Sequence, residues 1–189
     1  MRWEQLFADL EARVAEDEAR AELAEAASRA RVETGRVAWL DRVRGATGQQ
    51  VVLGCGRAGD VPGRVLDVGV DWVLLADARQ REVLVAAGSV RSVVGLGTLT
   101  AEPADDGVVA RALDLRRAVR GLARDRAALL CRLDDGTALT GTVDRVGADF
   151  LELAEHPLDE PRRRSAVRSV RLVVLASVAV LVSTVPALD

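Results

Sequence analysis

The spacing of apolar residues along the chain first predicts helices. Between residues 3 and 33 nearly every residue is a good helix former, and neither Gly nor Pro occurs. We therefore expect a long N-terminal helix that Gly35 ends. A shorter amphipathic helix follows, with Val37, Leu40 and Val43 facing inward, and stops at Gly45. The larger apolar residues of the first helix recur at spacings of three and four and form a candidate interface: Trp3, Phe7, Leu10 and Val14.

Short apolar runs separated by Gly, Pro and Asp then begin, and this pattern is typical of strands. Five short strands within one such stretch favour a small, strongly bent barrel. We expect these strands, with a single turn over residues 86–90, at residues 51–55, 63–68, 72–76, 82–85 and 91–94.

The same pattern occurs a second time. Residues 63–76 and 141–154 share one phrase, Gly-x-Val followed by Val-Gly-x-Asp-aromatic. A helix over residues 108–127 precedes the second copy, and its Val119-Arg120-Gly121 repeats Val43-Arg44-Gly45. Strands are expected at residues 129–133, 139–146 and 150–154. The unit that is duplicated is therefore a helix followed by a barrel.

The end of the second copy allows two alignments. Residues 167–170 match residues 90–93 letter for letter, but this match leaves the apolar residues 172–185 outside the barrel. Matching residues 172–178 with residues 82–90 instead makes strand four, a turn and strand five. We favour the second alignment because it buries the apolar run, which is also shorter than the roughly 20 residues of a spanning helix.

These elements predict an α+β, mainly β fold. It would consist of two SH3-like or Sm-like five-stranded small barrels, each preceded by a helix, with a long N-terminal helix. The predicted regions are an N-terminal helical region (1–47), a first barrel (48–97), a linker (98–107) and a helix plus second barrel (108–189).

The helix, the five short strands and the Gly-x-Asp-aromatic entry to strand three resemble the Sm-like (LSm) small β-barrels. The resemblance implies rings joined through strands four and five, with single-stranded RNA in a central pore. The Sm-like base pocket uses an Asn in strand three; the chain contains no Asn and has Trp72-Val73-Leu74 there. Residues 2–10 and the Val-Gly-Ala-Asp-Phe phrase also resemble an actinobacterial protein family, which implies no particular activity.

Charge is unevenly distributed along the chain. The net charge is −3, and all 26 basic residues are Arg. Residues 1–34 hold five Arg and nine acidic residues, whereas residues 108–132 hold seven Arg and two Asp. The basic clusters could bind phosphate oxygens, or the acidic N-terminal helix could compensate them. The candidate nucleic-acid or partner-binding residues are Arg116, Arg117, Arg120, Arg124, Arg162, Arg163, Arg164 and Arg168, with Arg171 beside the second group.

Residues with reactive side chains form no pattern of a catalytic, metal or cofactor site. Cys55 and Cys131 are expected to be buried free thiols, and His156 a solvated loop residue. No Ser has a general base at a suitable spacing, and the glycines of residues 54–59 fit a turn between strands. The repeated Asp71 and Asp149 are expected to be turn residues whose side chains hold the chain entry into strand three, and their aromatic neighbours to lie in the core or at its rim.

The sequence therefore predicts a cytoplasmic, non-enzymatic binding or assembly module. We expect a scaffold or regulatory protein that contacts a protein partner or itself through its barrel edges and its exposed helix. The alternative is RNA or single-stranded nucleic-acid binding through the arginine clusters. No cofactor, membrane span or small-molecule substrate is implied.

Overall fold

A computed structural model of the chain describes residues 13, 16, 18, 20, 22–25, 35–98, 100–101, 113–159, 162–163 and 166–186. The chain divides into two compact units, Met1–Ala38 and Trp39–Asp189. The described residues of the first unit between 13 and 25 are helical, and Arg20 pairs with Glu16 at 3.3 Å. The candidate interface of Trp3, Phe7, Leu10 and Val14 lies outside the described residues.

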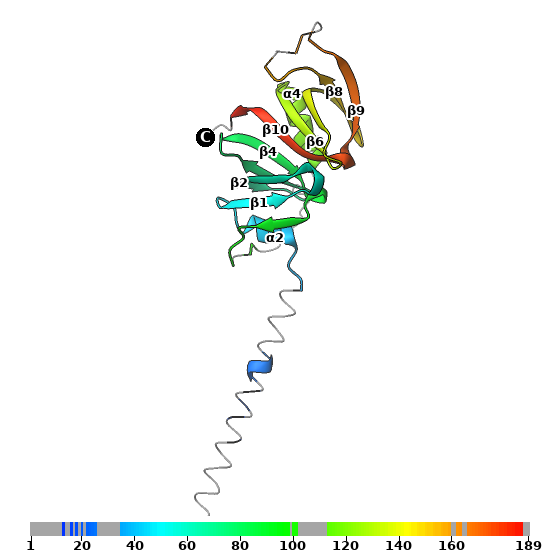
Figure 1. Ribbon diagram of the computed structural model, residues 1–189. Coiled ribbons are helices and arrows are strands. Elements are labelled where there is room, and N and C mark those ends of the chain that lie inside the picture. The colour runs from blue at the N-terminus through cyan, green and yellow to red at the C-terminus, as the bar shows by residue number, and fades with distance from the viewer. Residues whose placement is uncertain are drawn as a thin grey trace, which may run out of the picture. The chain divides into compact units, whose positions relative to one another are not determined.

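The second unit is built mainly of antiparallel strands (Figure 1). In the described part of this unit, the strands are accompanied by two α-helices and three single-turn 3₁₀ helices, labelled η. The elements follow in this order: α2 (Trp39–Arg44), β1 (Gln50–Gly54), η1 (Gly56–Ala58), β2 (Asp60–Val68), β3 (Trp72–Ala76), β4 (Arg81–Ala86), η2 (Ala87–Ser89), β5 (Ser92–Val94), α4 (Leu115–Asp125), β6 (Ala128–Leu133), β7 (Ala138–Val146), β8 (Phe150–Glu155), β9 (Ser169–Val174), η3 (Leu175–Ser177) and β10 (Val178–Pro186).

The predicted fold class, two five-stranded barrels with a long N-terminal helix, is wrong. All ten strands form one antiparallel sheet in the order β5-β1-β2-β3-β4-β10-β6-β7-β8-β9, and this sheet is not closed. Strands β4 and β10 join its two halves, with Leu84 opposite Leu181. The α-helices whose bounds are described are short. The error arises because apolar periodicity locates strands but does not say which edge of a strand finds a distant partner.

The two halves nevertheless repeat the same pairing. In each half four consecutive strands pair in chain order, and a fifth strand pairs with the first. The register also repeats, because Trp72 lies opposite Ala86 and Phe150 lies opposite Val174. Strand β9, η3 and β10 thus correspond to β4, η2 and β5. The alignment that makes residues 172–178 strand four, a turn and the start of strand five is confirmed.

The apolar core has two clusters, and each includes residues from the other half at the β4–β10 seam. The cluster of the first half includes Val180 and Val182 of β10, while that of the second half includes Trp72 and Leu84 of β3 and β4. Neither half therefore completes its core from its own residues.

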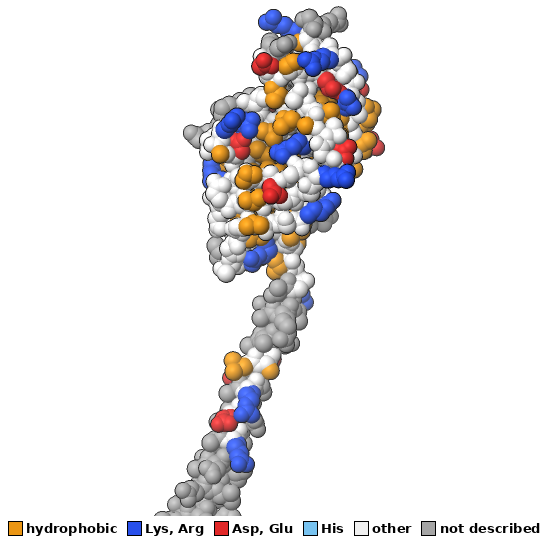
Figure 2. All heavy atoms as spheres, viewed as in Figure 1, with side chains coloured by type: hydrophobic (Ala, Val, Ile, Leu, Met, Phe, Trp, Pro, Cys, Tyr) orange, Lys and Arg blue, Asp and Glu red, His pale blue; other side chains and the backbone are white. Residues whose placement is uncertain are grey.

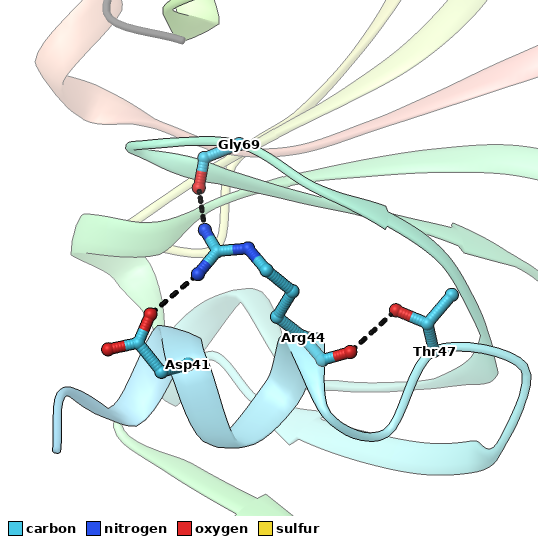
Figure 3. Close-up of polar contacts among 4 residues, drawn as sticks. All are labelled: Asp41, Arg44, Thr47 and Gly69. Carbon is cyan, nitrogen blue, oxygen red and sulfur yellow. Dashed lines mark hydrogen bonds and ion pairs between the residues drawn. The ribbon is translucent and has the colours of Figure 1, made fainter. Parts of the chain in front are cut away.

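Helix α2 packs beside β2, and α4 packs beside β7, which is the corresponding strand. Their matching residues Val43 and Val119 are both fully buried. Arg44 of α2 donates to Asp41 at 2.6 Å and to the carbonyl of Gly69 at 3.5 Å, so it ties the helix to the β2–β3 turn (Figure 3).

Candidate functional site

The repeated phrase has a structural role in both halves. A Cβ on Gly63 would lie 2.8 Å from the carbonyl oxygen of Ala76, and one on Gly141 would collide with the carbonyl of Ala154. Strand three can approach strand two this closely only because these residues lack a side chain. Both strand pairs also shift register at the equivalent place, between Val65 and Asp67 in the first half.

The second glycine of the phrase lies under the aromatic residue. A Cβ on Gly69 would overlap the ring of Trp72, and one on Gly147 would overlap the ring of Phe150. The carbonyl of Asp71 accepts from Ala87 N at 2.8 Å, which fixes the turn, and the carbonyl of Asp149 accepts equivalently. Both Asp lie at the bend before strand three, as predicted, but these bonds are made by backbone carbonyls and not by the side chains that were expected to hold the strand entry.

Trp72 and Asp71 have an additional role because they hold the start of α4. The indole Nε1 of Trp72 donates to the carbonyl of Leu113 at 2.8 Å, and Asp71 Oδ1 accepts from Leu115 N at 2.7 Å. Asp114 caps the helix by accepting from its third residue at 2.9 Å. Burial and the neighbouring Asp114 raise the pKa of Asp71 above its ordinary value, against the lowering effect of the Leu115 N–H.

Two hollows lie along α4, and we call them together the α4 groove. The first, of about 160 Å³, is mostly apolar and includes Leu74, Leu84 and Leu122, with Glu82 as its charged lining residue. The second, of about 440 Å³, is lined by Leu113, Gly121 and three arginines. Trp72 and Ala118 line both hollows, so the two adjoin. The groove combines an apolar pocket with a cationic rim.

The arginines predicted on α4 surround this groove, but they do not all face the same hollow. Arg117, Arg120 and Arg124 line the larger hollow, whereas Arg116 lies 3.7 Å from Asp114 and lines another depression. Arg124 has only a marginal ion pair, at 4.0 Å to its exposed neighbour Asp125. The structure thus brings three of the four together.

The second predicted arginine group is neutralised only in part. Arg162 pairs with Asp144 at 2.5 Å, and Arg171 pairs with Glu155. Arg163 and Arg168 are exposed, and Arg164 lies outside the described residues. On the face shown in Figure 2, arginine side chains are dispersed among acidic and apolar ones rather than gathered into one basic patch.

The two ends of the sheet are β9 and β5. Strand β9 pairs only with β8 among the described strands, and we call its open side the β9 edge. Three alternate residues of β9 expose large apolar side chains: Val170 at 59%, Leu172 at 58% and Val174 at 49%. At the other end, Val94 of β5 is 64% exposed. The sequence analysis predicted contacts through barrel edges but did not identify these residues, because the same residue pattern also fits a strand inside a sheet.

The prediction for His156 is wrong. Its ring is buried, with Nε2 2.9 Å from the hydroxyl of Thr142 and Nδ1 2.7 Å from the carbonyl of Pro157. A carbonyl only accepts, so Nδ1 carries a proton and donates it to Pro157. His156 thus anchors the β8–β9 connection, which the polar letters around it did not indicate.

The two cysteines are buried and free, as predicted. Burial raises the pKa of Cys131 to about 12, so its reactive thiolate form is strongly disfavoured. In the described part of the chain, no three His, Cys, Asp or Glu side chains gather as a metal site.

The chain matches no known family model and no curated protein. Its likeness to Sm-like proteins therefore stays a prediction. None of the described helices is both long and apolar enough to cross a membrane.

Proposed function

We propose that the chain is a non-enzymatic assembly module that binds a further strand along the β9 edge. One observation carries the proposal: β9 occupies in the second half the place that β4 occupies in the first, and β4 is covered by β10. The molecule thus contains one filled and one open copy of the same edge. An open edge presents unpaired backbone groups to another chain.

The internal seam also suggests the occupant and its register. Strand β5 corresponds to β10, because both pair with the first strand of their half. In the seam, Leu84 lies opposite Leu181. The equivalent contact between two copies places Leu172 of one copy opposite Val93 of the next. A second copy of the chain is therefore the occupant we propose.

Such a contact joins two different edges, so it is heterologous and leads to a closed ring or an open filament. The outer edges are more polar than the seam, because Arg171 replaces Val83 and Ser92 replaces Val180. We therefore expect a weaker, concentration-dependent association.

Disulfide trapping tests the register. Leu172→Cys mixed with Val93→Cys should yield a covalent dimer under mild oxidation, while the native thiols stay buried. Leu172→Cys mixed with Ser92→Cys is the matched control, because its partner is displaced by one residue. Equal yields in the two mixtures would exclude the proposed pairing.

Edge-blocked variants test the head-to-tail geometry. Leu172→Lys blocks β9, and Val94→Lys blocks β5, and light scattering should find each alone as a monomer. Their mixture still has one intact β9 and one intact β5, so it should form a dimer and nothing larger. A native chain that stays monomeric at high concentration would overturn self-assembly and direct the search to a different partner strand.

RNA binding through the arginines stays the alternative. Against it, Arg162 and Arg171 already pair with carboxylates. Salt-sensitive binding of oligouridine that is lost in Arg163→Ala/Arg168→Ala would favour this alternative.

A further inference from the structure

Helix α4, which borders the α4 groove, differs in charge from α2, the corresponding helix of the first half. The shared Val-Arg-Gly triplet aligns Arg44 with Arg120. The same alignment places Asp41, which pairs with Arg44, at the position of Arg117. In α4 an acidic partner has thus been replaced by a second cation. Among the described residues that line the larger hollow, none is a carboxylate equivalent to the one that pairs with the helix arginine in α2.

Gly121 provides a second, independent observation. Its counterpart Gly45 follows the last residue of α2, but α4 continues through Gly121 to Asp125. Glycine is, after proline, the least favourable residue inside a helix. Apart from its own stretch of chain, no described residue lies within 4 Å of the position that a Cβ on Gly121 would take. Close packing within the chain therefore does not require this glycine, and its missing side chain leaves the floor of the larger hollow open.

We propose that the α4 groove binds an acidic amphipathic helix of a partner protein. One large apolar side chain of that helix enters the 160 Å³ pocket, which has the size of cavities known to take a benzene ring. Its carboxylates pair with Arg120 and Arg124. These two arginines are four residues apart, about 6 Å along α4, which matches carboxylates on successive turns of a partner helix.

The lining favours a peptide over a nucleic acid. The charged residue of the apolar pocket is Glu82, which repels a phosphate or an anionic nucleotide. Trp72 is buried with its indole N–H bonded to Leu113, so its ring offers little surface on which a base could stack. An uncharged apolar side chain meets neither obstacle.

Fluorescence anisotropy with the full chain tests the proposal. The probes are labelled helical peptides of Ala and Glu with Phe, Leu or Ala at the centre. We expect saturable binding of the Phe or Leu peptide, weakened by added salt, and at least ~10-fold weaker binding of the Ala peptide because no side chain fills the pocket.

Two variants locate the site. Arg120→Glu/Arg124→Glu should weaken binding at least ~10-fold, whereas Arg168→Glu, an exposed arginine elsewhere, should leave it nearly unchanged. Gly121→Leu should abolish binding while raising Tm by ~2–4 °C, because a helix former replaces glycine in open space. A merely structural Gly121 would not produce this opposite pair of effects.

Three results would each overturn the proposal: neither the Phe nor the Leu peptide binds, Gly121→Leu binds them as well as the native chain, or oligouridine binds in their place and is lost in the same variants. The β9 edge is a separate surface, so Leu172→Lys should bind the peptides with native affinity. Loss of self-assembly alone therefore leaves this proposal intact.

Discussion

Strands β4 and β9 occupy the same position in the two halves, but β4 lies in the middle of the sheet and β9 ends it. Leu84 and Leu172 are equivalent by register, and the first is buried while the second is 58% exposed. The helices differ similarly, since Arg44 of α2 is neutralised by Asp41 and Arg120 of α4 faces a cationic hollow. The duplicated sequence thus conserves the scaffold within each half, and the differences between the halves mark the surfaces that are left for partners.

The largest expected difference in the free energy of unfolding is between substitutions of Leu84 and of Leu172. At low protein concentration, Leu84→Ala should lower the free energy of unfolding by ~2–4 kcal/mol because it leaves a cavity at the seam. Leu172→Ala should change it by less than about 0.5 kcal/mol. Urea unfolding measures both, and equal losses would mean that β9 is covered in solution.

The second-largest difference in the free energy of unfolding is expected between the two connections that join strand three to strand four. His156→Ala should cost ~2–3 kcal/mol in the free energy of unfolding, because the buried Thr142 hydroxyl loses its ring partner. Asp77→Ala removes the acceptor of the Arg79 and Arg81 N–H groups in an exposed turn and should cost about 1 kcal/mol.

Leu158→Ala, an exposed substitution in the same loop as His156, is the control. Thermal unfolding followed by circular dichroism compares the three variants. A His156→Ala variant no less stable than this control would contradict the anchoring role of the imidazole.

Substitutions of the helix arginines should show a smaller difference in the free energy of unfolding. Arg44→Ala removes a largely buried ion pair and should cost about 1 kcal/mol, whereas Arg120→Ala should stay within about 0.5 kcal/mol of the native chain. Chemical unfolding at low salt compares the two variants. A larger loss for Arg120 than for Arg44 would reverse the comparison.

The smallest expected effects are those of pH. The pKa of Asp71 is raised above 3.8, so its contribution to stability is present in acid and is lost as pH rises through the raised value. The pKa of Asp77 is lowered, because the N–H groups and guanidinium of its turn outweigh burial, so its contribution is lost as pH falls below 3.8.

Unfolding measured across this range should therefore show opposite slopes. The stability of the native chain relative to Asp71→Asn should fall with rising pH, and its stability relative to Asp77→Asn should rise. Slopes of the same sign would contradict the assigned environment of one carboxyl.

Local structure could be predicted from the sequence, and long-range pairing could not. The third strand was predicted at residues 72–76, where β3 lies, because apolar residues and flanking turn residues are local signals. The seam was missed because the pairing of Leu84 with Leu181 connects residues far apart in sequence. The burial of His156 likewise depends on Thr142 of another strand, and the charge of Arg162 on Asp144.

The position of β10 between β4 and β6 has a consequence for the growing chain. Synthesis produces β10 after every other described strand, so the strands of the first half wait with β4 uncovered and their core unfinished until β10 emerges. During that interval, nascent chains that lie close together expose the same apolar edge to one another. We therefore expect the seam to form last, and a chain that stops before Val178 to accumulate as insoluble material in a sedimentation assay.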